Sequence, residues 1–152
     1  MSLRTRFTEE MKKAMIAKEQ RRLSTIRLIL SALKDRDIAA RPSGVTDGIP
    51  EDQILSMLSG MVKQRRESIE QYEKGNRPDL VQQEAEEITV IESFMPTQMS
   101  EDEVKAVVEK IIAETGAASV KDLGKVMAEL KGRYAGQMDF SKASALAKGK
   151  LA

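Results

Sequence analysis

Basic side chains and glycines alternate in one short segment of this 152-residue chain. The segment contains Lys121, Gly124, Lys125, Lys131, Gly132 and Arg133. Lysine and arginine neutralise phosphate groups, and backbone without side chains permits close approach of a nucleic-acid strand. These residue types therefore indicate a surface that binds nucleic-acid phosphates.

Spacing decides which of these cations share a face of a helix. Lys121 and Lys125 are four residues apart, which places them about 40° apart around a helix axis, whereas Lys131 is rotated by about a further 120°. We predict that Lys121 and Lys125, with Arg133 from the following loop, form the phosphate-contacting surface. Lys131 stays a candidate that lies off this face.

The glycines also have a purely structural explanation. Glycine inside a short helix costs about 1 kcal/mol, so something should offset it. We favour close helix–helix packing at Gly124 and a left-handed turn at Gly132 or Gly136. Close approach of a nucleic-acid backbone is compatible with that explanation and stays open.

A second basic cluster lies at residues 63–66, where Arg65 and Arg66 offer guanidinium groups suited to phosphate. The alternative is that these arginines pair with Glu67, Glu70 and Glu73 one helical turn away. The sequence leaves both readings open.

Residues for catalysis are missing. The chain has no His and no Cys, and it lacks a phosphate-binding glycine loop, a nucleophile elbow and a metal-ligand cluster. The acidic run Glu84, Glu86 and Glu87 is more typical of a solvated helix face than of a Mg²⁺ site. We predict no catalytic residue, no cofactor and no metal, which leaves enzyme activity uncertain and unfavoured for the isolated chain.

Hydropathy indicates the compartment in which the protein resides, and the distribution of charge indicates the kinds of partner it could bind. No apolar run approaches the roughly 18 residues of a membrane span, and no secretory signal is visible, so we expect a cytoplasmic protein without membrane contact. Residues 1–66 carry 14 Lys/Arg against 8 Asp/Glu, residues 67–95 carry 2 against 8, and residues 115–152 carry 7 against 3. Two basic regions therefore flank an acidic one.

Apolar residues recur every three or four positions throughout, which predicts an all-α protein. The predicted helices begin and end near residues 3–18, 20–40, 50–75, 78–95, 100–116, 119–131 and 141–151. Ser100 and Glu103 form a capping box, and Met99 and Val104 a hydrophobic staple. Pro96 interrupts the pattern, so we predict an N-terminal domain of four helices (1–95) and a C-terminal domain of three (96–152).

Several ordered motifs resemble the GatB/YqeY family, and in particular its small stand-alone YqeY-like members. They are Met11-Lys12-Lys13-Ala14-Met15, Arg22-Leu23-Ser24-Thr25-Ile26-Arg27, Lys63-Gln64-Arg65-Arg66-Glu67-Ser68-Ile69, Phe94-Met95-Pro96-Thr97-Gln98-Met99, Gly124-Lys125-Val126-Met127 and Lys131-Gly132-Arg133. The resemblance implies a C-terminal domain similar to the tail of the B subunit of glutamine-dependent aminoacyl-tRNA amidotransferase, which helps to hold tRNA. One departure is Ala135, where family members often have an acid before the glycine that corresponds to Gly136.

Two functions of different classes follow. The first is an accessory module that binds tRNA or associates with a tRNA-dependent enzyme. The second is a protein–protein interaction module without nucleic-acid binding, which the alternation of charge also supports. The resemblance further implies carbon-nitrogen ligase activity with glutamine as amido donor, but such a role would need a partner that supplies the catalytic groups.

Overall fold

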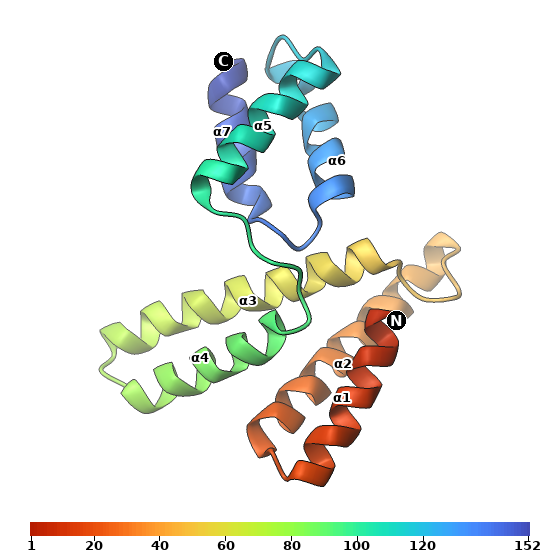
Figure 1. Ribbon diagram of the computed structural model, residues 1–152, viewed down its shortest axis with the longest axis vertical. Coiled ribbons are helices and arrows are strands. Elements are labelled where there is room, and N and C mark those ends of the chain that lie inside the picture. The colour runs from red at the N-terminus through yellow and green to blue at the C-terminus, as the bar shows by residue number, and fades with distance from the viewer. The chain divides into compact units, whose positions relative to one another are not determined.

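The computed structural model describes residues 1–152 and contains helices and no strands, which confirms the all-α prediction. The chain divides into two compact units, Met1–Met95 and Pro96–Ala152. Figure 1 shows the helices of each unit, coloured along the chain. That these units are two separate domains, 1–95 and 96–152, stays a prediction.

The first unit begins with two antiparallel helices, α1 (Leu3–Ala17) and α2 (Gln20–Ala40). Ser2 caps α1, because its side chain accepts a hydrogen bond from the backbone N–H of Thr5. Lys18 adopts a left-handed conformation with φ of 59°, which ends α1 and reverses the chain direction within two residues.

A second helical hairpin completes this unit, with α3 (Glu51–Lys74) and α4 (Pro78–Glu92). The short 3-10 helix η1 (Arg41–Ser43) continues directly from α2 and opens the loop that leads to α3. Pro50 precedes α3 and Gly75 ends it, whereas Pro78 is the first residue of α4, where its missing N–H needs no partner.

The core of this unit joins helices that are distant in sequence. Phe7 of α1 packs edge-to-face on Phe94, with ring centroids 4.9 Å apart and the ring planes at 76°. Arg6 lies over the same ring and donates a 3.1 Å hydrogen bond to the carbonyl of Ser93. The start of α1 is therefore fixed against the end of α4.

Arg4 fixes the loop between α2 and α3. Its guanidinium donates two 2.8 Å hydrogen bonds to Asp37, and a third of 3.1 Å to the carbonyl of Ile49. Asp37 also accepts a bond from the backbone N–H of Ile49. Gly48 has φ of 94°, and a Cβ there would lie 2.5 Å from the Arg4 guanidinium, so both conformation and space require glycine.

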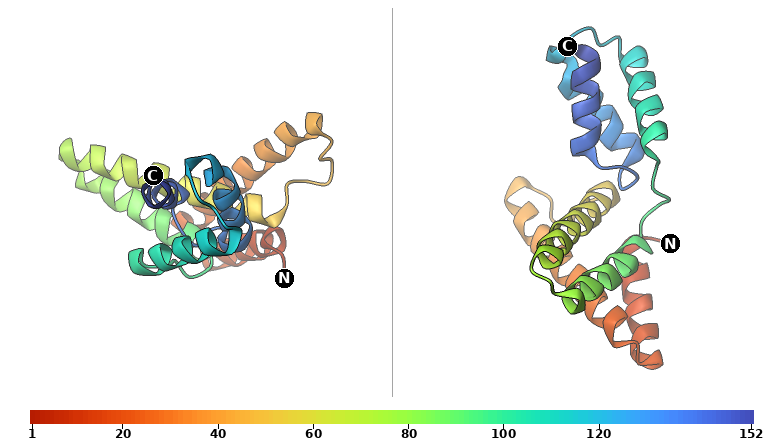
Figure 2. Two further views of the ribbon diagram at one scale, coloured as in Figure 1. Left: turned by 90° about the horizontal axis from the view of Figure 1, so that it is seen from above. Right: turned by 90° about the vertical axis from the view of Figure 1, so that its left-hand side faces the viewer.

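The second unit is a bundle of α5 (Glu101–Thr115), α6 (Leu123–Tyr134) and α7 (Phe140–Leu151), with the 3-10 helix η2 (Val120–Asp122) before α6. Figure 2 shows this bundle from two further sides. Its core is aliphatic and includes the fully buried Ile111, Val126 and Leu130. Small residues of α7, Ala143 and Ala147, let that helix pack closely.

Half of the predicted capping box is confirmed, because Ser100 caps α5 but the carboxylate of Glu103 contacts the Ser100 hydroxyl and not its backbone N–H. The Ser100 hydroxyl accepts a hydrogen bond from the backbone N–H of Glu103 and donates one of 3.2 Å to its carboxylate. Met99 packs against the core of the second unit, as the staple requires. By contrast, Ser119 makes no capping bond, and Asp122 instead accepts a bond from the N–H of Ala118.

Candidate functional site

The lysines of the predicted phosphate surface lie on one helical segment. Lys121 is in η2, and Lys125 and Lys131 are in α6. All three are exposed, and none of them forms an ion pair within the chain. Their charges are therefore available to an external anion.

Arg133 differs from these lysines in place and in partner. The expectation of a loop residue is wrong, because α6 extends to Tyr134 and includes Arg133. Its guanidinium donates a 2.7 Å hydrogen bond to Glu114 of α5 and lies 5.8 Å from the centre of the Tyr134 ring. The carboxylate of Glu114 already balances the charge of Arg133, although the pair is solvent-exposed.

The helical glycines of α6 are open to solvent. A Cβ on Gly124 or on Gly132 would meet no atom within 4 Å, so the expected helix–helix packing at Gly124 is wrong. The left-handed turn expected at Gly132 or Gly136 is confirmed at Gly136, with φ of 75°, whereas Gly132 is helical. No contact within the chain offsets the unfavourable helix propensity at positions 124 and 132.

Gly124, Ala128 and Gly132 are four residues apart and therefore lie one above another along α6. All three are exposed, so this side of the helix is covered by little more than backbone. Lys121 and Lys125 lie beside it at its N-terminal end. The segment thus combines accessible backbone with unpaired cations.

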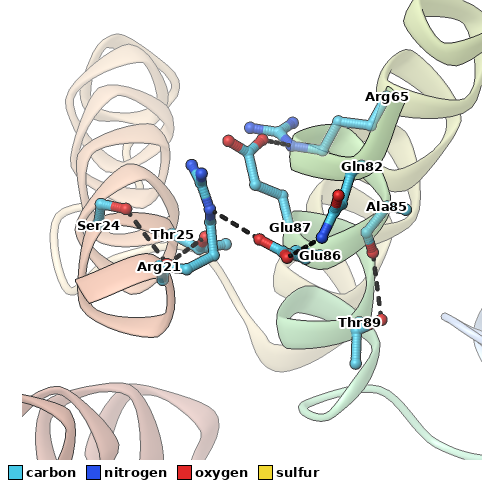
Figure 3. Close-up of polar contacts among 9 residues, drawn as sticks. All are labelled: Arg21, Ser24, Thr25, Arg65, Gln82, Ala85, Glu86, Glu87 and Thr89. Atoms are coloured by element: carbon cyan, nitrogen blue, oxygen red, sulfur yellow. Dashed lines mark hydrogen bonds and ion pairs between the residues drawn. The ribbon is translucent and has the colours of Figure 1, made fainter. Parts of the chain in front are cut away.

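Arg65 is engaged inside the first unit. Its Nε donates a 2.8 Å hydrogen bond to Glu87 (Figure 3). A second nitrogen of Arg65 donates a hydrogen bond of 3.2 Å to the carbonyl of Met61. Only 13% of the Arg65 side chain and 9% of the Glu87 side chain are exposed. A phosphate could reach Arg65 only by displacing a buried carboxylate.

Arg66 is more accessible, with 64% of its side chain exposed and a 3.4 Å contact to Glu92. The carboxylate partners of both arginines lie on α4 and are not the glutamates Glu67, Glu70 and Glu73 of α3. The two arginines therefore connect α3 to α4 by ion pairs. Sequence spacing missed these pairs because the residues are more than 20 positions apart.

The acidic run of α4 is only in part the solvated face that its sequence indicated, because Glu86 is exposed but Glu87 is buried. Glu87 is buried against Arg65, and Glu86 accepts a 3.1 Å hydrogen bond from Arg21 of α2 (Figure 3). Burial, and secondly the charge of Glu87, raise the pKa of Glu84 above its ordinary value. These carboxylates join three helices, and they form no group that could hold a metal ion.

A shallow hollow lies along α3. Its lining residues are Gln64, Glu67, Ser68, Glu70, Gln71 and Tyr72. The hollow carries acidic and amide groups and one half-buried tyrosine, and no nucleophile with an adjacent base.

None of the helices is both long and apolar enough to span a membrane.

This chain is similar in sequence to several curated proteins. It is 36% identical over 108 residues to Altered inheritance of mitochondria protein 41, mitochondrial, of Lachancea thermotolerans, which covers 70% of the chain and 56% of the relative. The protein of the same name from Kluyveromyces lactis is 33% identical over 108 residues, with the same coverage of 70% and 56%. That from Saccharomyces cerevisiae strain YJM789 is 35% identical over 86 residues, or 57% of the chain and 44% of the relative.

These relatives correct one expectation. They are named as mitochondrial proteins, so the expectation of a cytoplasmic protein is wrong. That expectation was a default drawn from missing signals, and a helical protein without an apolar span is compatible with several compartments. The chain spans about half the length of the curated relatives it matches.

The resemblance to YqeY-like proteins is confirmed over nearly the full length. The family profile described as Yqey-like protein matches residues 4–151, which includes every helix of both units. Since this match leaves only four residues outside it, the chain belongs to the family of YqeY-like proteins.

Proposed function

We propose that this chain is an accessory module that binds tRNA or associates with a tRNA-dependent enzyme, with α6 as its RNA-contacting element. The similarity of the C-terminal motifs to the tail of the amidotransferase B subunit supports tRNA as the RNA. In this proposal Lys121 and Lys125 contact phosphates, while Lys131 lies at the margin and Arg133 contributes only after it leaves Glu114.

The exposed side of α6 is the observation that carries the proposal. Gly124 and Gly132 leave its backbone uncovered without any packing benefit, and the lysines beside them are unpaired. A phosphate backbone needs both features, because it is bulky, anionic and bound largely by charge neutralisation. An enzymatic role is not part of the proposal for the isolated chain. Any carbon-nitrogen ligase activity would depend on a partner.

Titration of labelled tRNA with the full chain tests this function. Binding should weaken steeply between 50 and 200 mM salt, roughly in proportion to the phosphates contacted. Changing Lys121, Lys125 and Arg133 together to Ala should lower the magnitude of the salt slope by about two to three. Absence of binding at low salt, or binding that ignores salt, would refute the proposal.

A protein partner is the second candidate, and the hollow on α3 favours it. Tyr72 and the carboxylates Glu67 and Glu70 lie together there, and tyrosine is enriched at protein interfaces. Tyr72→Ala should then abolish co-purification of a defined partner that survives nuclease treatment. If the Tyr72→Ala variant still co-purifies that partner, or if nuclease treatment removes the partner, the α3 hollow is not its binding site.

A further inference from the structure

A line of three cations runs along α2 in the first unit. Arg27, Lys34 and Arg41 are seven residues apart, and Arg41 continues α2 with helical backbone angles of φ −58° and ψ −44°. Seven residues fall about 20° short of two helical turns and advance about 10 Å. The three side chains therefore lie on one side of the helix over about 20 Å. We call this line the α2 basic strip.

Each cation of the strip is exposed, and none forms an ion pair. Other cations of this unit are paired between helices, namely Arg4 with Asp37, Arg22 with Glu10 and Arg65 with Glu87. The helix dipole does not explain the strip either. Its effect is confined to the last turn, which includes Arg41 but neither Arg27 nor Lys34.

One acidic group borders this side of α2, because Asp37 lies four residues before Arg41 and interacts with it electrostatically. Ser31 and Ile38 lie between the cations, whereas Asp35 is turned about 100° away from Lys34. Asp37 faces Arg4, which takes both of its carboxylate oxygens. Arg4 thereby balances the charge of Asp37, and the strip keeps a net positive charge.

We propose that the α2 basic strip binds the phosphate backbone of RNA, as a contact surface separate from α6. The inference extends the proposed function, because it takes the same class of partner. A straight row of regularly spaced charges fits a polyphosphate chain. A protein interface is centred on aromatic and other well-packed anchors, which the strip lacks, and a membrane-surface helix needs a broad apolar face, of which Ile38 supplies only one partly exposed residue.

The test uses the full chain and three double variants. Arg27→Gln with Lys34→Gln removes two charges of the strip, and Arg36→Gln with Lys74→Gln removes two exposed, unpaired charges elsewhere in the same unit. Arg36 is rotated about 200° from Lys34, so it lies on the other side of α2. Lys121→Gln with Lys125→Gln removes the α6 contacts.

Affinity for labelled tRNA should be measured over a series of salt concentrations. The strip variant should lower the magnitude of the salt slope by about 1.5 to 2, and the Arg36/Lys74 control should leave it within about 0.5. Circular dichroism of the variants confirms folding, which all six substitutions should preserve because every site is exposed.

The outcomes separate the two proposals. If only the Lys121/Lys125 variant loses binding, the strip is not an RNA contact and the α6 proposal stands. If only the strip variant loses binding, the strip stands and the α6 site fails. Equal effects of the strip and control variants on the salt slope would overturn the strip as an RNA contact. The strip would also be overturned if the unmodified chain bound anionic lipid vesicles and not RNA, and if the strip variant lost that binding to vesicles. Absence of RNA binding by the unmodified chain overturns both.

Discussion

The guanidinium of Arg65 and the carboxylate of Glu87 are joined by a 2.8 Å hydrogen bond across the seam between α3 and α4, with about nine-tenths of each side chain shielded from solvent. Removal of one partner leaves an uncompensated buried charge, whereas removal of both leaves none. This asymmetry makes the pair a sensitive probe of the first unit.

We expect Arg65→Met to destabilise the chain by about 3 to 5 kcal/mol, and Arg65→Met with Glu87→Leu to recover most of that loss. Urea unfolding of the single and double variants measures both effects. The exposed pair Arg66–Glu92 is the control, and Arg66→Met should change stability by less than about 1 kcal/mol. Equal losses at Arg65 and Arg66 would contradict the assigned role of burial.

Acid should weaken the clamp between Arg4 and Asp37. The hydrogen bonds from Arg4 lower the pKa of Asp37 from its ordinary 3.8 to about 2. Because the folded pKa is depressed, the stabilisation is complete above the unfolded pKa of about 3.9 and is lost as the pH falls towards 2. Asp37→Asn should remove this contribution to the pH dependence of unfolding between about pH 4 and 2.

Asp79 provides the matched control for that measurement. Its pKa is also lowered, by Arg77, but the two residues are only two positions apart and both are largely exposed. The unfolded chain can keep much of this interaction, so Asp79→Asn should leave the acid-dependent part of unfolding nearly unchanged. An equal response of both variants would mean that Asp37 has no special role.

We expect that replacing the carboxylate of Glu84 by a neutral group raises the stability of the folded chain. Its pKa is raised, first by burial and then by Glu87, so the folded state disfavours the ionised carboxylate. The penalty is present at neutral pH and disappears as the pH falls below the unfolded pKa of about 4.3. Thermal melts at pH 7 should show a higher Tm for Glu84→Gln, and the gain should vanish near pH 3.5. Glu86→Gln, which loses a bond from Arg21, should give no gain.

The open glycines of α6 allow stability and binding to be separated. Gly124→Ala and Gly132→Ala should each stabilise the chain by about 0.5 to 1 kcal/mol, because the added methyl meets no atom and the helix propensity improves. If RNA approaches this backbone, the same variants should bind tRNA more weakly. Unchanged affinity in the stabilised variants would remove the glycines from the interface.

Local patterns in the sequence were sufficient for much of the fold. The three-to-four-residue periodicity identified every α-helix but not the 3-10 helix η1. Ser100 with Glu103 marked the start of α5. Both signals depend on neighbours within one turn. The family assignment also came from ordered local motifs. The features that depend on neighbouring residues, the helices and the start of α5, could therefore be predicted from the sequence.

Long-range pairing was beyond that reach. Nothing near Glu87 indicates that it meets Arg65, and a buried carboxylate looks like any other member of an acidic run. Gly124 was expected in a packed contact because helical glycine is costly, yet only the tertiary arrangement reveals which side of α6 faces solvent. The cations Lys121 and Lys125 could be named in advance, but their freedom from partners could not.

The contact of Arg6 and Phe7 with the end of α4 has a consequence for synthesis on the ribosome. The ring contact of Phe7 cannot form until Phe94 has been translated, which is 87 residues later. The hydrogen bond of Arg6 likewise cannot form until Ser93 has been translated. α1 and α2 can meet early as a local hairpin, but the aromatic face of α1 has no final partner until α4 has emerged. At roughly 5 to 20 residues per second, that interval lasts several seconds, during which the nascent hairpin exposes Phe7 to chaperones.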